Sequence, residues 1–178
     1  VEKVNTERKI AMATRVAQAC DGSVRDKTIA VLGVTFKPNT DDMRESPSLV
    51  ILPWLQARGA KIRACDPPGA DKGKDLLPGV VWAQNALEAA QDADVVLVLT
   101  EWNEFRALDL VELRNAMRGN ILLDMRNVYT PAAAAAAGLI HYGIGRGGFL
   151  SERNATPLSS PLTDLDRSAS SPASASVS

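Results

Sequence analysis

The segment Ala93 to Thr100 reads Ala-Asp-Val-Val-Leu-Val-Leu-Thr and is almost entirely apolar. A strand without a polar side is typical of the centre of a parallel sheet that helices cover on both faces. Further strand-like runs, separated by stretches of helical length, are Thr28 to Val34, Lys61 to Cys65, Val80 to Ala83, Asn120 to Met125 and Leu139 to Ile144. Strands that alternate with helices predict βαβ units. Right-handed crossovers then give a doubly wound parallel α/β sheet of about six strands.

The chain also predicts a helix before the first strand. Between Val1 and Ala19, a partial apolar stripe recurs at helical spacing, formed by Val4, Ala13, Val16, Ala17 and Cys20. The other predicted helices are Ser48 to Arg58, Asp71 to Leu77, Ala86 to Ala90, Asp109 to Met117 and Pro131 to Ala137. The first helix has no capping residue ahead of it. We therefore expect a piece of a longer chain, although a short protein with a freely starting helix is the alternative.

Composition suggests three regions and excludes several functions. Residues 1–22 form the first helix, residues 23–148 the α/β domain, and residues 149–178 a Ser-, Ala- and Pro-rich tail that we expect to be disordered. The 20 basic and 21 acidic residues leave a net charge of -1. Without a basic excess, nucleic acid is not an expected partner. No apolar run approaches the roughly 20 residues that a membrane span needs, and no signal peptide pattern is present.

The residue types that usually perform catalysis or bind metals are scarce. Cys20 and Cys65 are far apart and are predicted to be reduced, buried thiols of a cytoplasmic protein. His141, the only histidine, lies in a strand-like run and is predicted to be structural. Neither a zinc site nor a Ser-His-Asp or Cys-His arrangement follows from these residues. We therefore assign no catalytic residue and no metal ligand.

The loop from Gly33 to Pro47 is the strongest functional signal. It joins a buried strand to a predicted helix start, with Ser46 as the cap and Pro47 at the first helical position. Loops of this kind, at the carboxyl ends of parallel strands, bind anionic ligands in open α/β sheets. The loop lacks the G-x-G-x-x-G fingerprint, so a side chain must contact phosphate, and Lys37 is placed to do so. A solvated connection is the alternative.

Several other strand ends carry polar side chains. Lys37 and Arg126 can converge near the point where the sheet order reverses, and this pairing suits a diphosphate. Asp66 could hold ribose hydroxyls, as in dinucleotide folds, or could initiate a turn, which is the favoured interpretation. Asp41 and Asp42 are expected to bond their own loop or to balance Arg44. Trp102 could stack on a base, but packing is the favoured role.

Four segments resemble the carboxy-terminal, UDP-binding domain of the UDP-glucose/GDP-mannose dehydrogenase family. They are Leu-Gly-Val-Thr-Phe-Lys-Pro-Asn-Thr-Asp-Asp-Met-Arg-Glu-Ser-Pro-Ser from Leu32, Asp66-Pro67, Thr-Glu-Trp-Asn-Glu-Phe from Thr100, and Asp-Met-Arg-Asn from Asp124. The resemblance covers roughly residues 1–146. The Thr-Glu-Trp segment favours the members that act on UDP-glucose over the UDP-N-acetylmannosamine and GDP-mannose relatives.

The resemblance implies roles for individual residues. Phe36, Lys37 and Arg126 would contact the nucleotide-sugar, with Lys37 near the diphosphate. Arg44 would reach an NAD bound by another domain. The first helix, Val1 to Ala19, would be the end of a central helix that lies in a homodimer interface. The family oxidises the primary alcohol of UDP-glucose to a carboxylate in two NAD-dependent steps, through a thiohemiacetal on a cysteine.

The chain departs from the family pattern in what it lacks. The glycine-rich NAD domain and the segment with the catalytic cysteine do not occur in this sequence, and Cys20 and Cys65 lie outside that motif. We therefore expect the chain alone to be inactive as a dehydrogenase. The alternatives are a stand-alone, non-catalytic UDP-sugar binding module, half of a related UDP-N-acetylmannosamine or GDP-mannose dehydrogenase, and an NAD-binding domain that relies on Asp66.

Overall fold

A computed structural model describes residues 1–144 and shows helices and strands alternating along the chain. The helices are α1 (Glu2–Ala19), α2 (Ser48–Ala57), α3 (Ala70–Leu76), α4 (Ala86–Ala90), α5 (Asn103–Arg106), α6 (Leu110–Ala116) and α7 (Pro131–Ala136). The strands are β1 (Thr28–Leu32), β2 (Lys61–Cys65), β3 (Val81–Trp82), β4 (Val95–Val98), β5 (Ile121–Asp124) and β6 (Ile140–Gly143).

All strands pair in parallel in one six-stranded sheet with the order β3-β2-β1-β4-β5-β6. β1 and β4 form the central pair, with Ile29 beside Val95. From this pair the chain builds outwards in both directions, first to β2 and β3 and then to β5 and β6. The predicted doubly wound parallel α/β fold is therefore confirmed.

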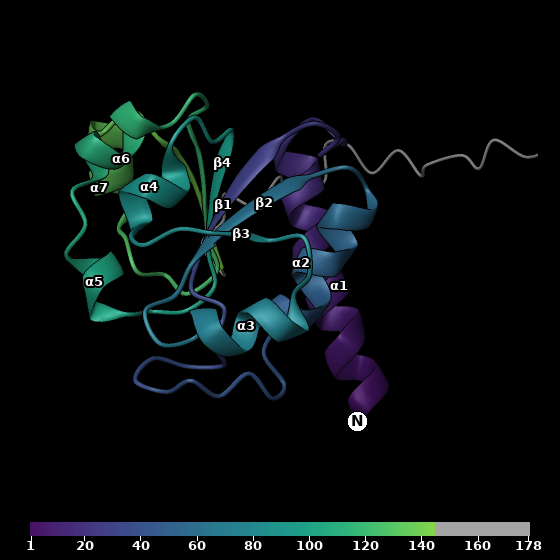
Figure 1. Ribbon diagram of the computed structural model, residues 1–178. Helices are drawn as coiled ribbons and strands as arrows, with labels where there is room; N and C mark the ends of the chain where they lie inside the picture. Colours follow the sequence, from purple (N-terminus) through teal and green to yellow (C-terminus); the bar gives the residue numbers. More distant parts are fainter. Residues whose placement is uncertain (145–178) are drawn as a thin grey trace, which may run out of the picture.

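The helices cover both faces of the sheet (Figure 1). α1 and α2 lie on one face, and α4, α6 and α7 lie on the other. Successive residues of a strand point to opposite faces, so Val31 joins the first core and Leu32 joins the second. All four residues of β4 are fully buried, which confirms the central place predicted for this strand.

Three details differ from the sequence prediction. The helix α5 was not predicted, because a helix of four residues is too short to show a periodic pattern. Val4, expected in the buried stripe of α1, is 52% exposed, whereas Ala13 and Val16 are fully buried. The predicted cap is displaced by one residue, because α2 begins at Ser48 and Pro47, not Ser46, is its N-cap residue. Ser46 Oγ instead accepts from Ser48 N at 3.3 Å and donates to Val34 O at 2.5 Å.

The tail, the two cysteines and the helices bear on three further predictions. The predicted tail, residues 149–178, lies outside the described residues. Cys20 and Cys65 are free and buried, as expected. Within residues 1–144, no helix combines the length and the apolar character that crossing a bilayer requires.

Candidate functional site at the carboxyl edge of the sheet

The sheet order reverses between β1 and β4. At the carboxyl edge of the sheet, the loop after β1 leads to α2 on one face, and the loop after β4 leads towards α6 on the other face. In open α/β sheets this position is the ligand crevice. The loop after β5 lies at the same edge, one strand further along. These three loops carry Lys37, Glu101 and Arg126.

The loops after β1 and β4 approach each other closely at Gly33. This residue has φ +87°, and a Cβ built on it would lie 2.4 Å from Thr100 Cβ and 2.9 Å from Thr100 N. Only glycine fits such a contact without a shift of the backbone. Thr100 Oγ1 also donates to Thr35 O at 2.8 Å, so the start of the long loop is fixed to the end of β4.

Asp66, directly after β2, fixes the same loop from the other side. Its Oδ2 accepts from Val34 N at 2.7 Å and from Thr35 N at 3.0 Å, and its Oδ1 accepts from Gly69 N at 2.8 Å. The side chain is almost fully buried. The favoured prediction, a turn-forming aspartate, agrees with this geometry. The same bonds turn the carboxylate towards the backbone N–H groups of Val34, Thr35 and Gly69 rather than towards a ribose.

The middle of the loop carries two ion pairs. Arg44 donates from Nε and Nη2 to Asp42, each at 3.0 Å, and this contact holds the pKa of Asp42 at about 2. Asp42 O also accepts from Phe36 N at 2.9 Å. The expectation that Asp42 balances Arg44 is confirmed. Asp41 has a different partner, because Lys72 of α3 lies 2.7 Å from its Oδ2 and lowers its pKa.

Two of the predicted substrate residues, Phe36 and Lys37, are presented to solvent by this loop. Phe36 is 46% exposed, which is unusual for a large aromatic side chain. Lys37 is exposed, and among the described residues it has no ion pair. Arg44, predicted to contact the cofactor, has a side chain that is 89% exposed. An aromatic face and an unpaired ammonium group are therefore available at this edge.

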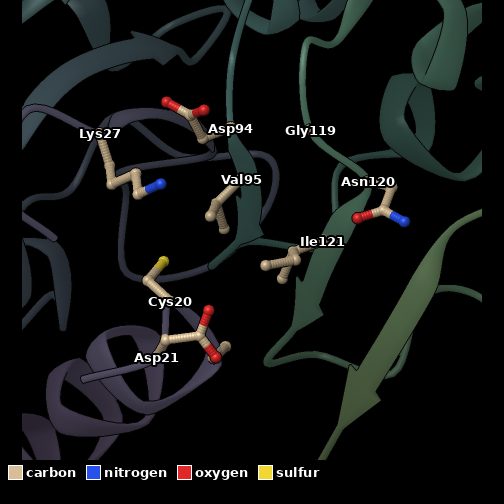
Figure 2. Close-up of a pocket in the computed structure, with 9 residues that line it drawn as sticks. Cys20, Asp21, Lys27, Asp94, Val95, Gly119, Asn120 and Ile121 are labelled. Carbon is tan, nitrogen blue, oxygen red and sulfur yellow. The ribbon is translucent and has the colours of Figure 1, made fainter. Parts of the chain in front are cut away.

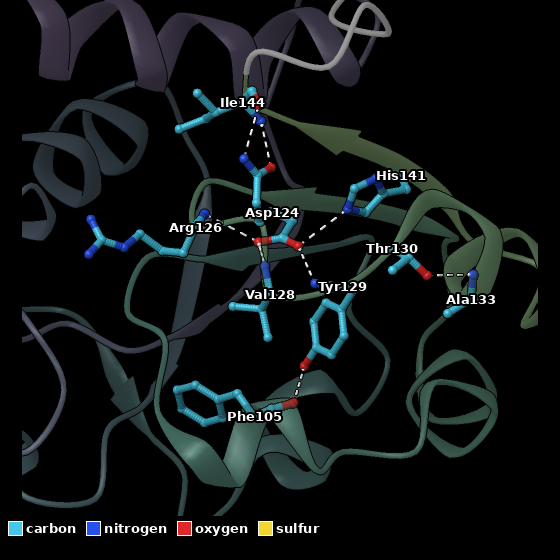
Figure 3. A network of polar contacts seen from close by, with 10 residues as sticks. Phe105, Asp124, Arg126, Val128, Tyr129, Thr130, Ala133, His141 and Ile144 are labelled. Carbon is cyan, nitrogen blue, oxygen red and sulfur yellow. Dashed lines mark hydrogen bonds and ion pairs between the residues drawn. The ribbon is translucent and has the colours of Figure 1, made fainter.

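Arg126, the third predicted substrate residue, is held at two points. Its backbone N donates to Asp124 Oδ1 at 3.2 Å. Its side chain extends away from Asp124 (Figure 3) and binds Glu101 with Nε and Nη2. The hydrogen bond to Arg126 is the main cause that lowers the pKa of Glu101. The Arg126 side chain is 36% exposed, and its Nη1 can still donate.

Asp124 organises the loop after β5 and connects it to β6. It is fully buried and accepts backbone hydrogen bonds from Val128 and Tyr129 as well as from Arg126 (Figure 3). His141 Nε2 lies 3.3 Å from Asp124 Oδ2, so the structural role predicted for His141 agrees with its position. Tyr129 OH donates to Phe105 O, and burial raises the pKa of this tyrosine.

The fold brings Lys37 and Arg126 to one edge on either side of β4. Neighbouring strands lie about 4.8 Å apart, so the ends of β1 and β5 are separated by about 10 Å. Two long side chains can span that gap around a diphosphate. Trp102, in contrast, is 9% exposed and packs in the core beside α4 and α6, which agrees with packing rather than base stacking.

Sequence reasoning assigned no individual role to Glu101 or Asp124, although both belong to the motifs quoted for the family. The feature of the sequence that could have identified them is their place at the ends of strands. In the described part of the chain, no group of three or more His, Cys, Asp or Glu side chains is arranged to hold a metal ion.

A cavity of about 140 Å³ lies at the opposite, amino edge of the sheet (Figure 2). Cys20, Lys27 and Asp94 line it, together with the first residues of β4 and β5. Burial raises the pKa of the Cys20 thiol to about 11, so no thiolate forms there near neutral pH. The carboxyl edge, with its cationic loops, remains the candidate ligand site.

A doubly wound parallel sheet with cationic loops at the carboxyl ends of its strands defines the class of nucleotide-binding α/β domains. Comparison with known proteins gives the family. Residues 30–131 match the UDP binding domain of the UDP-glucose/GDP-mannose dehydrogenase family. The chain belongs to this family.

The relatives with known names agree with this assignment. The UDP-glucose 6-dehydrogenase of Rhizobium meliloti (strain 1021) is 45% identical over 143 residues, which span 80% of this chain and 33% of that protein. UDP-glucose 6-dehydrogenase YwqF of Bacillus subtilis (strain 168) is 40% identical over 147 residues, spanning 82% of this chain and 33% of that protein. The chain therefore spans about a third of the length of these curated relatives.

A solved structure shows the same fold at lower sequence identity. A UDP-glucose dehydrogenase from Pyrobaculum islandicum superposes with a TM-score of 0.59 at 29% identity, covering 68% of this chain and 27% of that one.

Proposed function

We propose that this chain is the nucleotide-sugar binding part of an NAD-dependent UDP-glucose 6-dehydrogenase. The observation that carries the proposal is the pair of cationic side chains on either side of β4, in a chain that matches the UDP binding domain of the family. Lys37 supplies an unpaired positive charge, and Arg126 supplies a planar donor group in a fixed orientation.

The proposed binding mode assigns one function to each exposed side chain. The diphosphate of UDP-glucose lies between Lys37 and the free Nη1 of Arg126, since charge-assisted hydrogen bonds to phosphate are strong and directional. Phe36 covers an apolar face of the ligand. Arg44, whose side chain is 89% exposed, reaches an NAD that is bound elsewhere in the protein.

Oxidation itself requires groups outside this chain. Cys20 and Cys65 are buried, and burial raises the pKa of Cys65 to about 12, so neither thiol is an available nucleophile. NAD would bind mainly to an amino-terminal domain outside this chain, which spans only about a third of the length of its relatives. The chain by itself then binds substrate and does not turn it over.

The assembly and the cell compartment complete the proposal. The amino-terminal half of α1 exposes apolar side chains, with Val4 at 52% and Ile10 at 37% exposed. We assign residues 1–22 to an interdomain helix that forms a homodimer, and residues 23–148 to the substrate domain. Two free cysteines are typical of a reducing compartment, and the cytoplasm is the proposed location.

Isothermal titration calorimetry on this chain tests the binding proposal. UDP-glucose and UDP should bind, GDP-mannose should bind more weakly, and NAD should not bind. Tight NAD binding without UDP binding would replace the proposal with a cofactor domain. A coupled NADH assay on the same chain should give no turnover with UDP-glucose, and sustained turnover would contradict the division of labour proposed here.

A further inference from the structure

Two buried aspartates at the carboxyl edge share one hydrogen-bonding pattern. Asp66 is 2% exposed and Asp124 is 0% exposed. Each accepts from three backbone N–H groups and lies within hydrogen-bond distance of one further side chain, Thr35 Oγ1 at 3.1 Å for Asp66 and His141 Nε2 at 3.3 Å for Asp124. A buried carboxylate is costly unless its oxygens are satisfied in this way.

Each aspartate acts on a loop that carries one candidate substrate cation. Asp66 binds the backbone of Val34 and Thr35, three and two residues before Lys37. Thr35 Oγ1 lies 3.3 Å from Lys37 O, so one hydroxyl lies between the carboxylate and the loop segment that bears the lysine. Asp124 acts more directly, because it binds Arg126 N itself.

The two contacts are independent of each other. Asp66 follows β2 and fixes the loop after β1, whereas Asp124 ends β5 and fixes the loop after β5. β4 lies between the two loops, and no described hydrogen bond connects the two carboxylates. Neither carboxylate faces the ligand crevice, since both are buried and directed at backbone donors.

We propose that Asp66 and Asp124 are positioning residues for nucleotide-sugar binding, with Asp66 holding Lys37 in place and Asp124 holding Arg126. The inference rests on the function proposed above. Asp66 occupies the place at the end of the second strand where dinucleotide folds keep an acid for the ribose, but here it orders the neighbouring phosphate loop instead. The pairing of one aspartate with one cation distinguishes this role from a general contribution to stability.

Crossed double-mutant cycles on UDP-glucose affinity test this pairing. Asp66→Asn places an amide N–H against a backbone donor and should weaken binding by about 5- to 30-fold, the scale of one or two lost hydrogen bonds. Asp124→Asn should have an effect of the same size. Lys37→Ala and Arg126→Gln remove the two cations separately.

The expected coupling is specific. In the Lys37→Ala background, Asp66→Asn should cause no further loss, because the positioned group is already absent. Asp124→Asn should still cause its full loss in that background. The reverse should hold in the Arg126→Gln background, where only Asp66→Asn retains its effect.

Two milder variants keep the test usable if the asparagine variants do not fold. Thr35→Val removes only the hydroxyl beside Asp66. His141→Asn replaces only the imidazole beside Asp124 with a shorter side chain. They should show the same specific coupling with smaller effects. If all four variants lower the melting temperature but combine additively with both cation variants, the inference is wrong while the proposed function stands. If the unmodified chain does not bind UDP-glucose, the proposed function fails and this inference fails with it.

Discussion

Glu101 holds the guanidinium of Arg126 through both carboxylate oxygens, with 2.5 Å between Nε and Oε2 and 2.9 Å between Nη2 and Oε1. This bidentate contact ties the end of β4 to the loop after β5. It uses one side of the guanidinium fork and leaves Nη1 for a ligand. Glu101 therefore fixes the orientation of the Arg126 guanidinium.

The stability that this ion pair contributes should depend on pH. Arg126 lowers the pKa of Glu101 below its ordinary value of 4.5, so the contribution is fully present above that value and is lost as the pH falls through the lower, folded-state pKa. Glu101→Gln should reduce the free energy of unfolding at pH 7 by about 1 kcal/mol or less. The difference between the two proteins should shrink below pH 4.5 in urea unfolding experiments.

Glu7→Gln, an exposed position on α1, is the matched control and should leave the unfolding free energy nearly unchanged at both pH values. A difference between wild type and Glu101→Gln that stays constant with pH would show that the pair is not ionic.

Removal of the unpaired lysine should weaken substrate binding directly. Lys37→Ala should cost about 1–3 kcal/mol, or about 5- to 150-fold in the dissociation constant of UDP-glucose, because a charge-assisted contact to phosphate is lost. Calorimetric titration measures this change. Lys61→Ala, at the start of β2 on the opposite edge of the sheet, should bind as the unmodified chain does. Equal affinity of both variants would remove Lys37 from the site.

The close approach of two strand ends predicts an intolerant glycine. Gly33→Ala introduces a Cβ 2.4 Å from Thr100 Cβ in a left-handed backbone conformation. Gly22→Ala shares a positive φ, of +91°, but its Cβ would enter open space. Gly33→Ala should therefore lower the free energy of unfolding by about 1–3 kcal/mol more than Gly22→Ala, the range typical of an overpacked site. Equal losses in chemical denaturation would mean that the contact with Thr100 relaxes freely.

The thiols should be unreactive in the folded chain. Burial raises the pKa to about 11 for Cys20 and to about 12 for Cys65, so almost no thiolate exists at pH 8. A thiol-specific disulfide reagent should label neither cysteine in the native protein and both cysteines after unfolding. Rapid labelling of either native thiol would reopen the question of a nucleophile in this domain.

Much of the fold could be predicted because the signals are local. A run of apolar residues such as Ala93 to Thr100 can be stable only where both faces are covered, and the alternation of strands with helices along the chain predicts two covering layers. The strands were correspondingly predicted within one or two residues of their observed bounds. The single-turn helix α5 escaped prediction, since four residues do not display a period.

The candidate site could be predicted only in part. Phe36 was assigned through the resemblance to the family, whereas a polar loop after a buried strand pointed to Lys37 and the carboxyl edge. The order of strands and helices pointed to a doubly wound sheet. These conclusions follow from the order of residues alone, because apolar runs and helical or strand periodicity are properties of local sequence.

Only the tertiary structure decides which group each charged side chain binds. Arg126 binds Glu101, 25 positions away, and Asp41 binds Lys72 of α3. Asp66 binds the backbone of Val34 and Thr35, in the loop after β1, instead of facing the crevice. Each of these choices depends on distances of a few ångströms between segments that are remote in the chain, and Coulomb and hydrogen-bond energies change steeply over such distances.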